Sequence, residues 1–148
     1  MSRLVKVAAA LLLGGATYAF ALTADEVKAH VMKAKAYCDE VGVAKCVAEI
    51  GKKGGMFDKG DLYIWANDFD GVITAHPKKP LAGKNLYRYK DKAGNQLFKN
   101  FIDKVKADGQ GWVDYVWAHP TTGKQTPKSS FVIGIGENQL IGSGYYKE

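Results

Sequence analysis

The stretch 111–135, GWVDYVWAHPTTGKQTPKSSFVIGI, constrains the fold more than any other part of the chain. Its first half alternates with a period of two, which is typical of a β-strand whose side chains point to opposite faces. The two alternating sets are Trp112, Asp114 and Val116 on one face and Val113, Tyr115 and Trp117 on the other. A turn at 119–123, containing proline and glycine, precedes the apolar run 131–135, so we expect a β-hairpin. Pro127, Lys128, Ser129 and Ser130 then fall between its strands.

The residues after position 22 have the pattern of two helices. Thr23 and Glu26 form a capping box, in which each side chain satisfies a backbone donor at a helix start. Apolar residues then recur at spacings of three and four, as on the buried face of a helix. This stripe comprises Val27, Val31, Ala34, Tyr37, Cys38 and Val41. Gly42 ends the first helix, and a shorter apolar stripe over 43–50 predicts a second.

Strand patterns return from Asp61 onward. Alternation over 62–66 and an apolar run over 72–76 predict two strands joined by a turn at 68–71. A loop at 77–88 leads to a third helix, which Asn95 caps and whose buried stripe is Leu97, Phe98, Phe101, Ile102 and Val105. The hairpin and a last strand at 139–146 follow. The sequence therefore predicts one α+β domain around an antiparallel sheet of about five strands.

The first 21 residues resemble a cleaved secretory signal. Arg3 and Lys6 precede an apolar run that ends in Ala19-Phe20-Ala21, a small-x-small cleavage pattern. The alternative is an uncleaved anchor, although the run is short for a membrane span. We expect residues 1–21 to be removed and residues 22–148 to form a single periplasmic or secreted domain with no membrane span. Its scattered lysines form no basic cluster with stacking aromatics, so we do not expect nucleic acid as a partner.

Cys38 and Cys46 are the only cysteines, and an oxidising compartment favours a disulfide between them. On one straight helix their positions would be about 12 Å apart, which is too far to join. We therefore expect the chain to bend at Gly42 and bring the two thiols together.

Other chemistries find little support in the sequence. Neither zinc-ligand spacing nor a haem-attachment motif is present, and the Asp-x-Asp-Gly turn at 68–71 lacks the later glutamate of a calcium loop. We expect no metal and no cofactor. Ser129 and Ser130 lack a strained nucleophile turn, and the acidic residues show no paired spacing, so we expect a protein that is not an enzyme.

Several separated motifs together resemble a single Cache domain of the second type, an extracytoplasmic sensor module. They are GDLYIWANDFDGVITAHP, LAGKNL, GQGWVDYVWAHPTTGKQTPKSSFV and GSGYY, in that order from about Asp25 to Tyr146. The resemblance implies a PAS-like five-stranded antiparallel sheet with a long N-terminal helix packed across it. It also implies a pocket for small organic acids such as acetate, propionate, pyruvate or lactate. Such domains sit outside the membrane in chemoreceptors or histidine kinases.

The resemblance and the aromatic hairpin together suggest the binding residues. We expect Lys128 to pair with a carboxylate, Tyr115 and Ser130 to donate hydrogen bonds, and Trp117 to cover the alkyl end. His76 ends a strand and either faces the pocket or holds the following loop. The alternatives are that Lys128 is a solvated surface lysine and that Tyr115 and Trp117 are simply core. We expect His119 to be exposed.

The chain printed here ends at Glu148, without a signalling module. We therefore expect it to act in signal transduction through a separate membrane partner: a receptor, a kinase or a transporter. Two other functions stay open at this point, a ligand-free protein interaction module and a small secreted enzyme.

Overall fold

The computed structural model describes residues 21–147, so all but the last residue of the expected signal segment 1–21 lies outside them. Thr23 and Glu26 form the predicted capping box and start helix α1 (Ala24–Val41). Gly42, at a φ of +89°, separates it from α2 (Val43–Ile50), because this backbone conformation is open to glycine and strained for other residues. Among residues 21–147, no helix is long and apolar enough to cross a membrane.

Five strands form the central antiparallel sheet in the order β4-β3-β7-β6-β5. Their bounds are β3 (Trp65–Asp68), β4 (Ile73–Ala75), β5 (Gln110–Ala118), β6 (Gln125–Ile135) and β7 (Gln139–Tyr146). The predicted PAS-like α+β fold is therefore confirmed. A small additional hairpin, β1 (Asp58–Lys59) and β2 (Leu62–Tyr63), lies outside this sheet. This hairpin was not predicted: the single strand expected over 62–66 divides into β2, which pairs with β1, and β3, which joins the main sheet.

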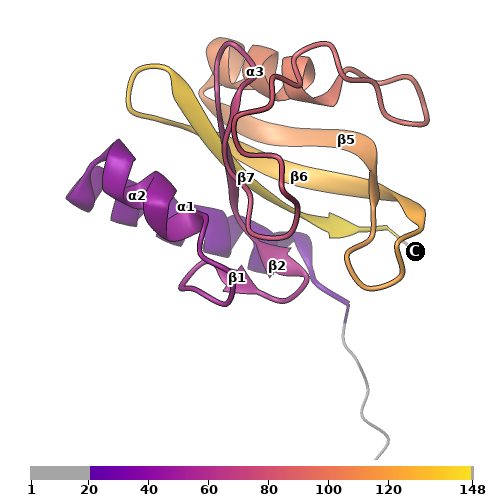
Figure 1. Ribbon diagram of the computed structural model, residues 1–148, viewed down its shortest axis with the longest axis horizontal. Coiled ribbons are helices and arrows are strands. Elements are labelled where there is room, and N and C mark those ends of the chain that lie inside the picture. Colours follow the sequence, from indigo (N-terminus) through magenta and orange to yellow (C-terminus); the bar gives the residue numbers. More distant parts are fainter. Residues whose placement is uncertain (1–20, 148) are drawn as a thin grey trace, which may run out of the picture.

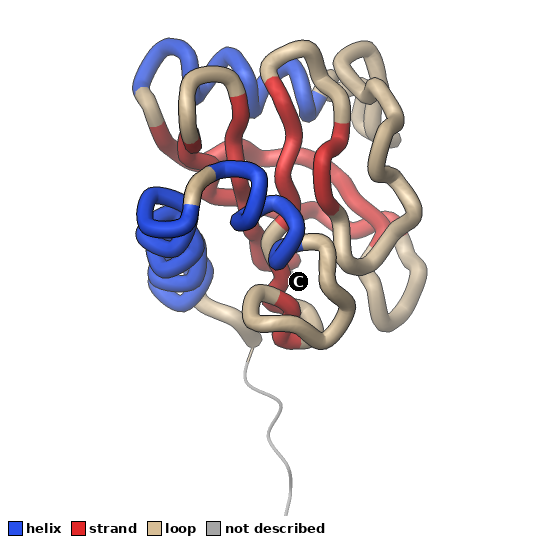
Figure 2. Tube along the Cα trace, turned by 60° about the vertical axis from the view of Figure 1, so that its left-hand side comes forward, coloured by secondary structure: helices blue, strands red, loops and turns tan. Residues whose placement is uncertain are grey.

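Helices cover both faces of the sheet (Figures 1 and 2). On one face α1 packs across β6 and β7, and α2 contacts β3 and β4. On the other face lies α3 (Leu97–Asp108), which packs on β5 and β6. All five residues of its predicted stripe are buried. The strands consequently carry apolar side chains on both faces; Ile64 and Ala66 join the core under α1, whereas Trp65 joins the core under α3.

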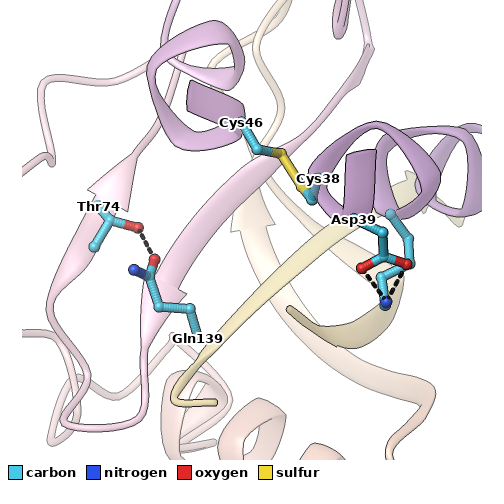
Figure 3. Close-up of a disulfide and its surroundings, with 6 residues drawn as sticks. Cys38, Asp39, Cys46, Thr74 and Gln139 are labelled. Carbon is cyan, nitrogen blue, oxygen red and sulfur yellow. Dashed lines mark hydrogen bonds and ion pairs between the residues drawn. A yellow bond between two sulfur atoms is a disulfide. The ribbon is translucent and has the colours of Figure 1, made fainter. Parts of the chain in front are cut away.

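Cys38 and Cys46 form a disulfide between α1 and α2, as predicted (Figure 3). The bend at Gly42 brings their Cα atoms to 4.8 Å. Both residues are buried in the core under α1. The bridge therefore fixes the angle between the two helices. Near α2, Thr74 of β4 donates a hydrogen bond to Gln139 of β7 at 2.9 Å and ties those two strands together (Figure 3).

Two local predictions were wrong. The hairpin turn spans the residues between Ala118 and Gln125, so Pro127 to Ser130 lie within β6 and not in the connection. Asn95 does not cap α3: Gln96 occupies the N-cap position without a side-chain hydrogen bond. The Asn95 backbone and side-chain amides instead donate to the Asp91 carboxylate at 2.8 and 2.9 Å. That carboxylate also accepts from Val116 and so pins the loop to the edge of β5.

Candidate ligand-binding site

A small cavity lies between the sheet and α3. The centre of a water molecule can occupy a volume of about 10 Å³ in it, which is room for roughly one water. The lining side chains come from β2, β3, the end of β4, α3, β5 and β6. They are Tyr63, Trp65, His76, Leu97, Phe98, Phe101, Tyr115, Trp117 and Lys128.

The register of the sheet explains how the polar side of the cavity is built. Lys128 on β6 is the direct cross-strand partner of Tyr115 on β5 and of Tyr146 on β7, so all three side chains share one face. Next along the same face, Ser130 pairs with Gly144. A Cβ atom at Gly144 would lie 2.8 Å from Cε of Lys128, so glycine leaves the room that the lysine side chain occupies.

Lys128 is buried, with a residue exposure of 2%. Its ammonium donates a hydrogen bond to the Tyr63 hydroxyl at 3.1 Å. It also lies 4.6 Å from the ring centroid of Tyr63 and 4.8 Å from that of Tyr146, within the range of cation–π attraction. No carboxylate in residues 21–147 forms an ion pair with it. The surface-lysine alternative therefore does not hold.

The charge of Lys128 depends on two opposing effects. Burial lowers the pKa of the ammonium, whereas the phenolic oxygens of Tyr115 and Tyr63 raise it, and the net direction is upward. Burial also raises the pKa of the Tyr115 phenol well above its usual value. The Tyr115 phenol is therefore neutral at neutral pH, where it is a hydrogen-bond donor or acceptor and not a base.

His76 both lines the cavity and holds the loop that follows it. Its Nδ1 accepts from the backbone N–H groups of Lys78 and Lys79 at 3.2 and 3.1 Å. Burial, with the positive charges of Lys128 and Lys79, lowers its pKa from 6.5 to about 3, so the ring is neutral. Because Nδ1 is an acceptor in a neutral ring, the hydrogen must be on Nε2. His76 therefore has an N–H group to donate.

The predicted site residues separate into two groups. Lys128, Tyr115, Trp117 and His76 all line the cavity. Ser130 does not; its hydroxyl is hydrogen-bonded to the Tyr115 hydroxyl at 2.7 Å and positions that phenol from behind. His119 was predicted to be exposed, and this was wrong: its side chain is 13% exposed, and its ring lies 4.4 Å from that of Tyr146.

Sequence reasoning missed five lining residues. Tyr63 and Trp65 were recognised only as one face of a strand. Leu97, Phe98 and Phe101 were recognised only as the buried stripe of α3. The aromatic rings among them pack closely: the ring centroid of Phe101 lies 5.1 Å from those of Trp65 and Tyr115, and the ring centroid of Phe98 lies 6.2 Å from that of Trp117. The second aromatic face of β2 and β3 was the available signal for Tyr63 and Trp65.

Metal chemistry finds no support in the part of the chain that the structure describes. Within it, no three histidine, cysteine or acidic side chains gather closely enough to hold an ion. The donors around the cavity are an ammonium, phenols and an imidazole, which suit an anion.

The fold is a PAS-like antiparallel sheet with a small internal cavity between the sheet and α3. A family model of the Cache domain, dCache_2, matches residues 22–148. The chain therefore belongs to the Cache domain family, as its motifs predicted.

Known proteins agree with this assignment. The chain is 32% identical over 88 residues to the sensor histidine kinase MctS of Rhizobium johnstonii; the match covers 58% of this chain but only 19% of the kinase. A methyl-accepting chemotaxis protein from Vibrio parahaemolyticus has a similar structure, with a TM-score of 0.70 and 30% identity over 82% of this chain and 86% of that one. The domain is thus homologous to sensor domains of kinases and chemoreceptors.

A third similarity concerns the fold alone. A Cache chemosensory domain solved in a study of carboxylic acid recognition superposes with a TM-score of 0.71 at 23% identity. The superposition covers 84% of this chain and 92% of that one.

Proposed function

We propose that this domain binds a small organic monocarboxylate in the cavity between the sheet and α3. The observation that carries the proposal is the buried Lys128 ammonium, which has no carboxylate partner within residues 21–147. Burying a cation without a counterion costs free energy. An anionic ligand would supply the missing charge.

Three neutral groups can complete the recognition of the carboxylate. His76, Tyr63 and Tyr115 line the same cavity as Lys128, and they offer the Nε2–H of the imidazole and two hydroxyls. A carboxylate that leaves water must replace its hydration by hydrogen bonds and an opposite charge. One ammonium with three neutral donors suits a single negative charge. A dicarboxylate would bring a second charge for which the described lining has no cation.

The apolar part of the lining favours a short hydrocarbon tail. Leu97, Phe98, Phe101 and Trp65 offer apolar surface and no charge. The cavity of about 10 Å³ leaves little free space, so a ligand must be short and must displace lining side chains. We therefore propose acids of the acetate, propionate, pyruvate and lactate class.

The proposed role is sensing and not catalysis. Family membership and homology to kinase and chemoreceptor sensor domains support it. The upward pKa shift of Tyr115 also argues against a phenolate base beside Ser130. We propose that the domain lies in the periplasm or outside the cell and passes its bound or free state to a receptor, kinase or transporter in the membrane.

Thermal unfolding of the purified mature protein with a panel of short acids tests the proposal. A ligand that binds only the folded state raises the melting temperature as its concentration rises. We expect at least one monocarboxylate to do so, and succinate to have no effect. A melting temperature that no acid changes would favour the ligand-free interaction module instead.

A further inference from the structure

The burial of the lining residues indicates where the cavity opens. Eight of the nine are buried, and His76 alone is half-buried. Tyr63, Trp65 and Lys128 are 2 to 3% exposed, and the three residues of α3 are 1 to 3% exposed. The way between solvent and cavity therefore passes His76 and the residues that follow it.

Residues 76–80, which we call the strap, form a compact unit on this side of the cavity. The Nδ1 of His76 accepts from the backbone N–H groups of Lys78 and Lys79, so the chain folds back around the imidazole ring. That ring packs on Tyr63, with 5.3 Å between centroids, and lies 6.4 Å from Trp117. A movement of the strap would thus carry His76 out of the cavity wall.

Two side chains fasten the strap to the rest of the domain. Lys78 forms an ion pair with Asp58 of β1, with 2.6 Å between Nζ and Oδ1. The Asp58 carboxylate is 5% exposed, and its other oxygen accepts from the backbone of Gly54 at 2.8 Å, so it is a fixed anchor. Lys79 places its ammonium 5.1 Å from the Trp117 ring centroid.

We propose that the strap gates the cavity and that the Lys78–Asp58 ion pair, which we call the latch, holds the strap closed. This inference rests on the proposed function, because control of access to the cavity matters only if the cavity takes up a ligand. Lys78 and Asp58 are then positioning residues: they hold His76 in the wall without touching the ligand. The short β1–β2 hairpin supplies Asp58 and Tyr63. In the closed state it is a part of the domain that the strap contacts.

The strength of the latch fits a contact that opens and closes. Lys78 is 25% exposed, so water weakens its attraction to the carboxylate. Cation–π contacts of partly exposed lysines are similarly modest. The strap can therefore detach while the sheet and α3 stay packed, as local openings require far less than global unfolding.

Amide hydrogen exchange tests the latch without any ligand. The Lys78 and Lys79 amides bond to His76 and should be protected in the wild type. In Lys78→Met and in Asp58→Asn we expect them to exchange about tenfold faster, while the Phe101 amide in α3 keeps its rate. Lys84→Met, which removes an exposed lysine of the same loop, is the matched control and should change nothing. Unchanged exchange rates of the Lys78 and Lys79 amides in both variants would overturn the proposal. Exchange at the Phe101 amide that accelerates by the same factor would also overturn it, because the whole domain would then be opening.

Stopped-flow binding of pyruvate adds a functional readout. If the strap controls access, Lys78→Met should raise the association and dissociation rate constants together, by about tenfold each, with a dissociation constant within a factor of three of the wild type. Rate constants equal to those of the wild type would contradict the proposal that the strap controls access to the cavity. If the wild type binds no acid at all, the proposed function fails, and the exchange measurement still decides whether the strap opens independently.

Discussion

Lys128 and Tyr63, which are 65 residues apart in the chain, meet through a hydrogen bond of 3.1 Å inside the domain. The lysine comes from β6, and the tyrosine comes from the small hairpin outside the main sheet. Their contact joins the charge of the candidate site to the segment that also supplies Asp58. Polarity, shape and access of the cavity therefore depend on the same few residues.

Gly144→Ala should damage the site through crowding. The new methyl group would collide with the Ser130 hydroxyl and lie 2.8 Å from Cε of Lys128. Overpacking of this kind costs about 1 to 3 kcal/mol of unfolding free energy, and we expect carboxylate binding to weaken as Lys128 is displaced. Urea unfolding and calorimetry measure the two effects. Gly51→Ala is the control, because its methyl group would make ordinary contacts of 3.7 Å; equal stability of the two variants would contradict the packing argument.

His76 should make stability depend on pH. Its pKa falls from 6.5 to about 3 on folding, so between these values the unfolded chain binds a proton that the folded domain does not. Stability is therefore lost as pH decreases from 6.5, by at most about 1.4 kcal/mol per pH unit from this residue. His76→Gln should flatten the profile between pH 6.5 and 4.5, a window above the titration of the carboxyls of Asp58 and Asp91, whose pKa values are lowered. Urea unfolding across this range tests the prediction; an unchanged slope would show that folding does not lower the pKa of the His76 imidazole.

The disulfide should stabilise the domain. Closing a loop of 8 residues restricts the unfolded chain and contributes about 2 to 3 kcal/mol on the chain-entropy estimate. Replacing both Cys38 and Cys46 by alanine should lower the unfolding free energy by at least that amount, since both side chains are also buried. Thiol titration of the unfolded, unreduced wild type should find no free thiol. Two titratable thiols would contradict the bridge.

Export should produce a protein that begins at Leu22. This proposal rests on the charged start, the apolar run and Ala19-Phe20-Ala21, all in the segment 1–21. Intact mass spectrometry of the protein recovered from the periplasm gives the answer directly. A mass that retains Arg3 and Lys6 would mean an uncleaved anchor.

Much of the fold followed from local patterns, whereas the site did so only in part. Periods of two and of 3.6 located the main strands and the stripe of α3, because both patterns reflect burial on one face. The same stripe could not show that Leu97, Phe98 and Phe101 wall a cavity, since a pocket wall and a core have the same composition. The segment around Lys128 resembled a connection because proline, lysine and serine are common in turns. Its burial within β6 is a tertiary effect, set by Tyr115 and Tyr146 on the neighbouring strands.

The capping error at α3 has a similar origin. Asn95 has the side chain of a good cap, but the Asp91 carboxylate nearby accepts its hydrogen bonds. Local sequence indicates which residues can cap a helix, and the competition between partners decides which one does. His119 illustrates the same limit, because the Tyr146 ring that covers it is distant in sequence.

Calorimetry of the Lys128→Met variant is the most direct test of the central claim. Methionine keeps much of the side-chain volume and removes the buried charge, so the ligand-free variant should unfold at the wild-type temperature or above it. Binding of the acid that stabilises the wild type should weaken by about 2 to 4 kcal/mol, which is tens to several hundredfold. Lys124→Met, at an exposed lysine of the same hairpin, should bind like the wild type. If the Lys128→Met variant is folded and binds the acid as tightly as the wild type does, Lys128 is not the charge partner, and the site assigned here is wrong.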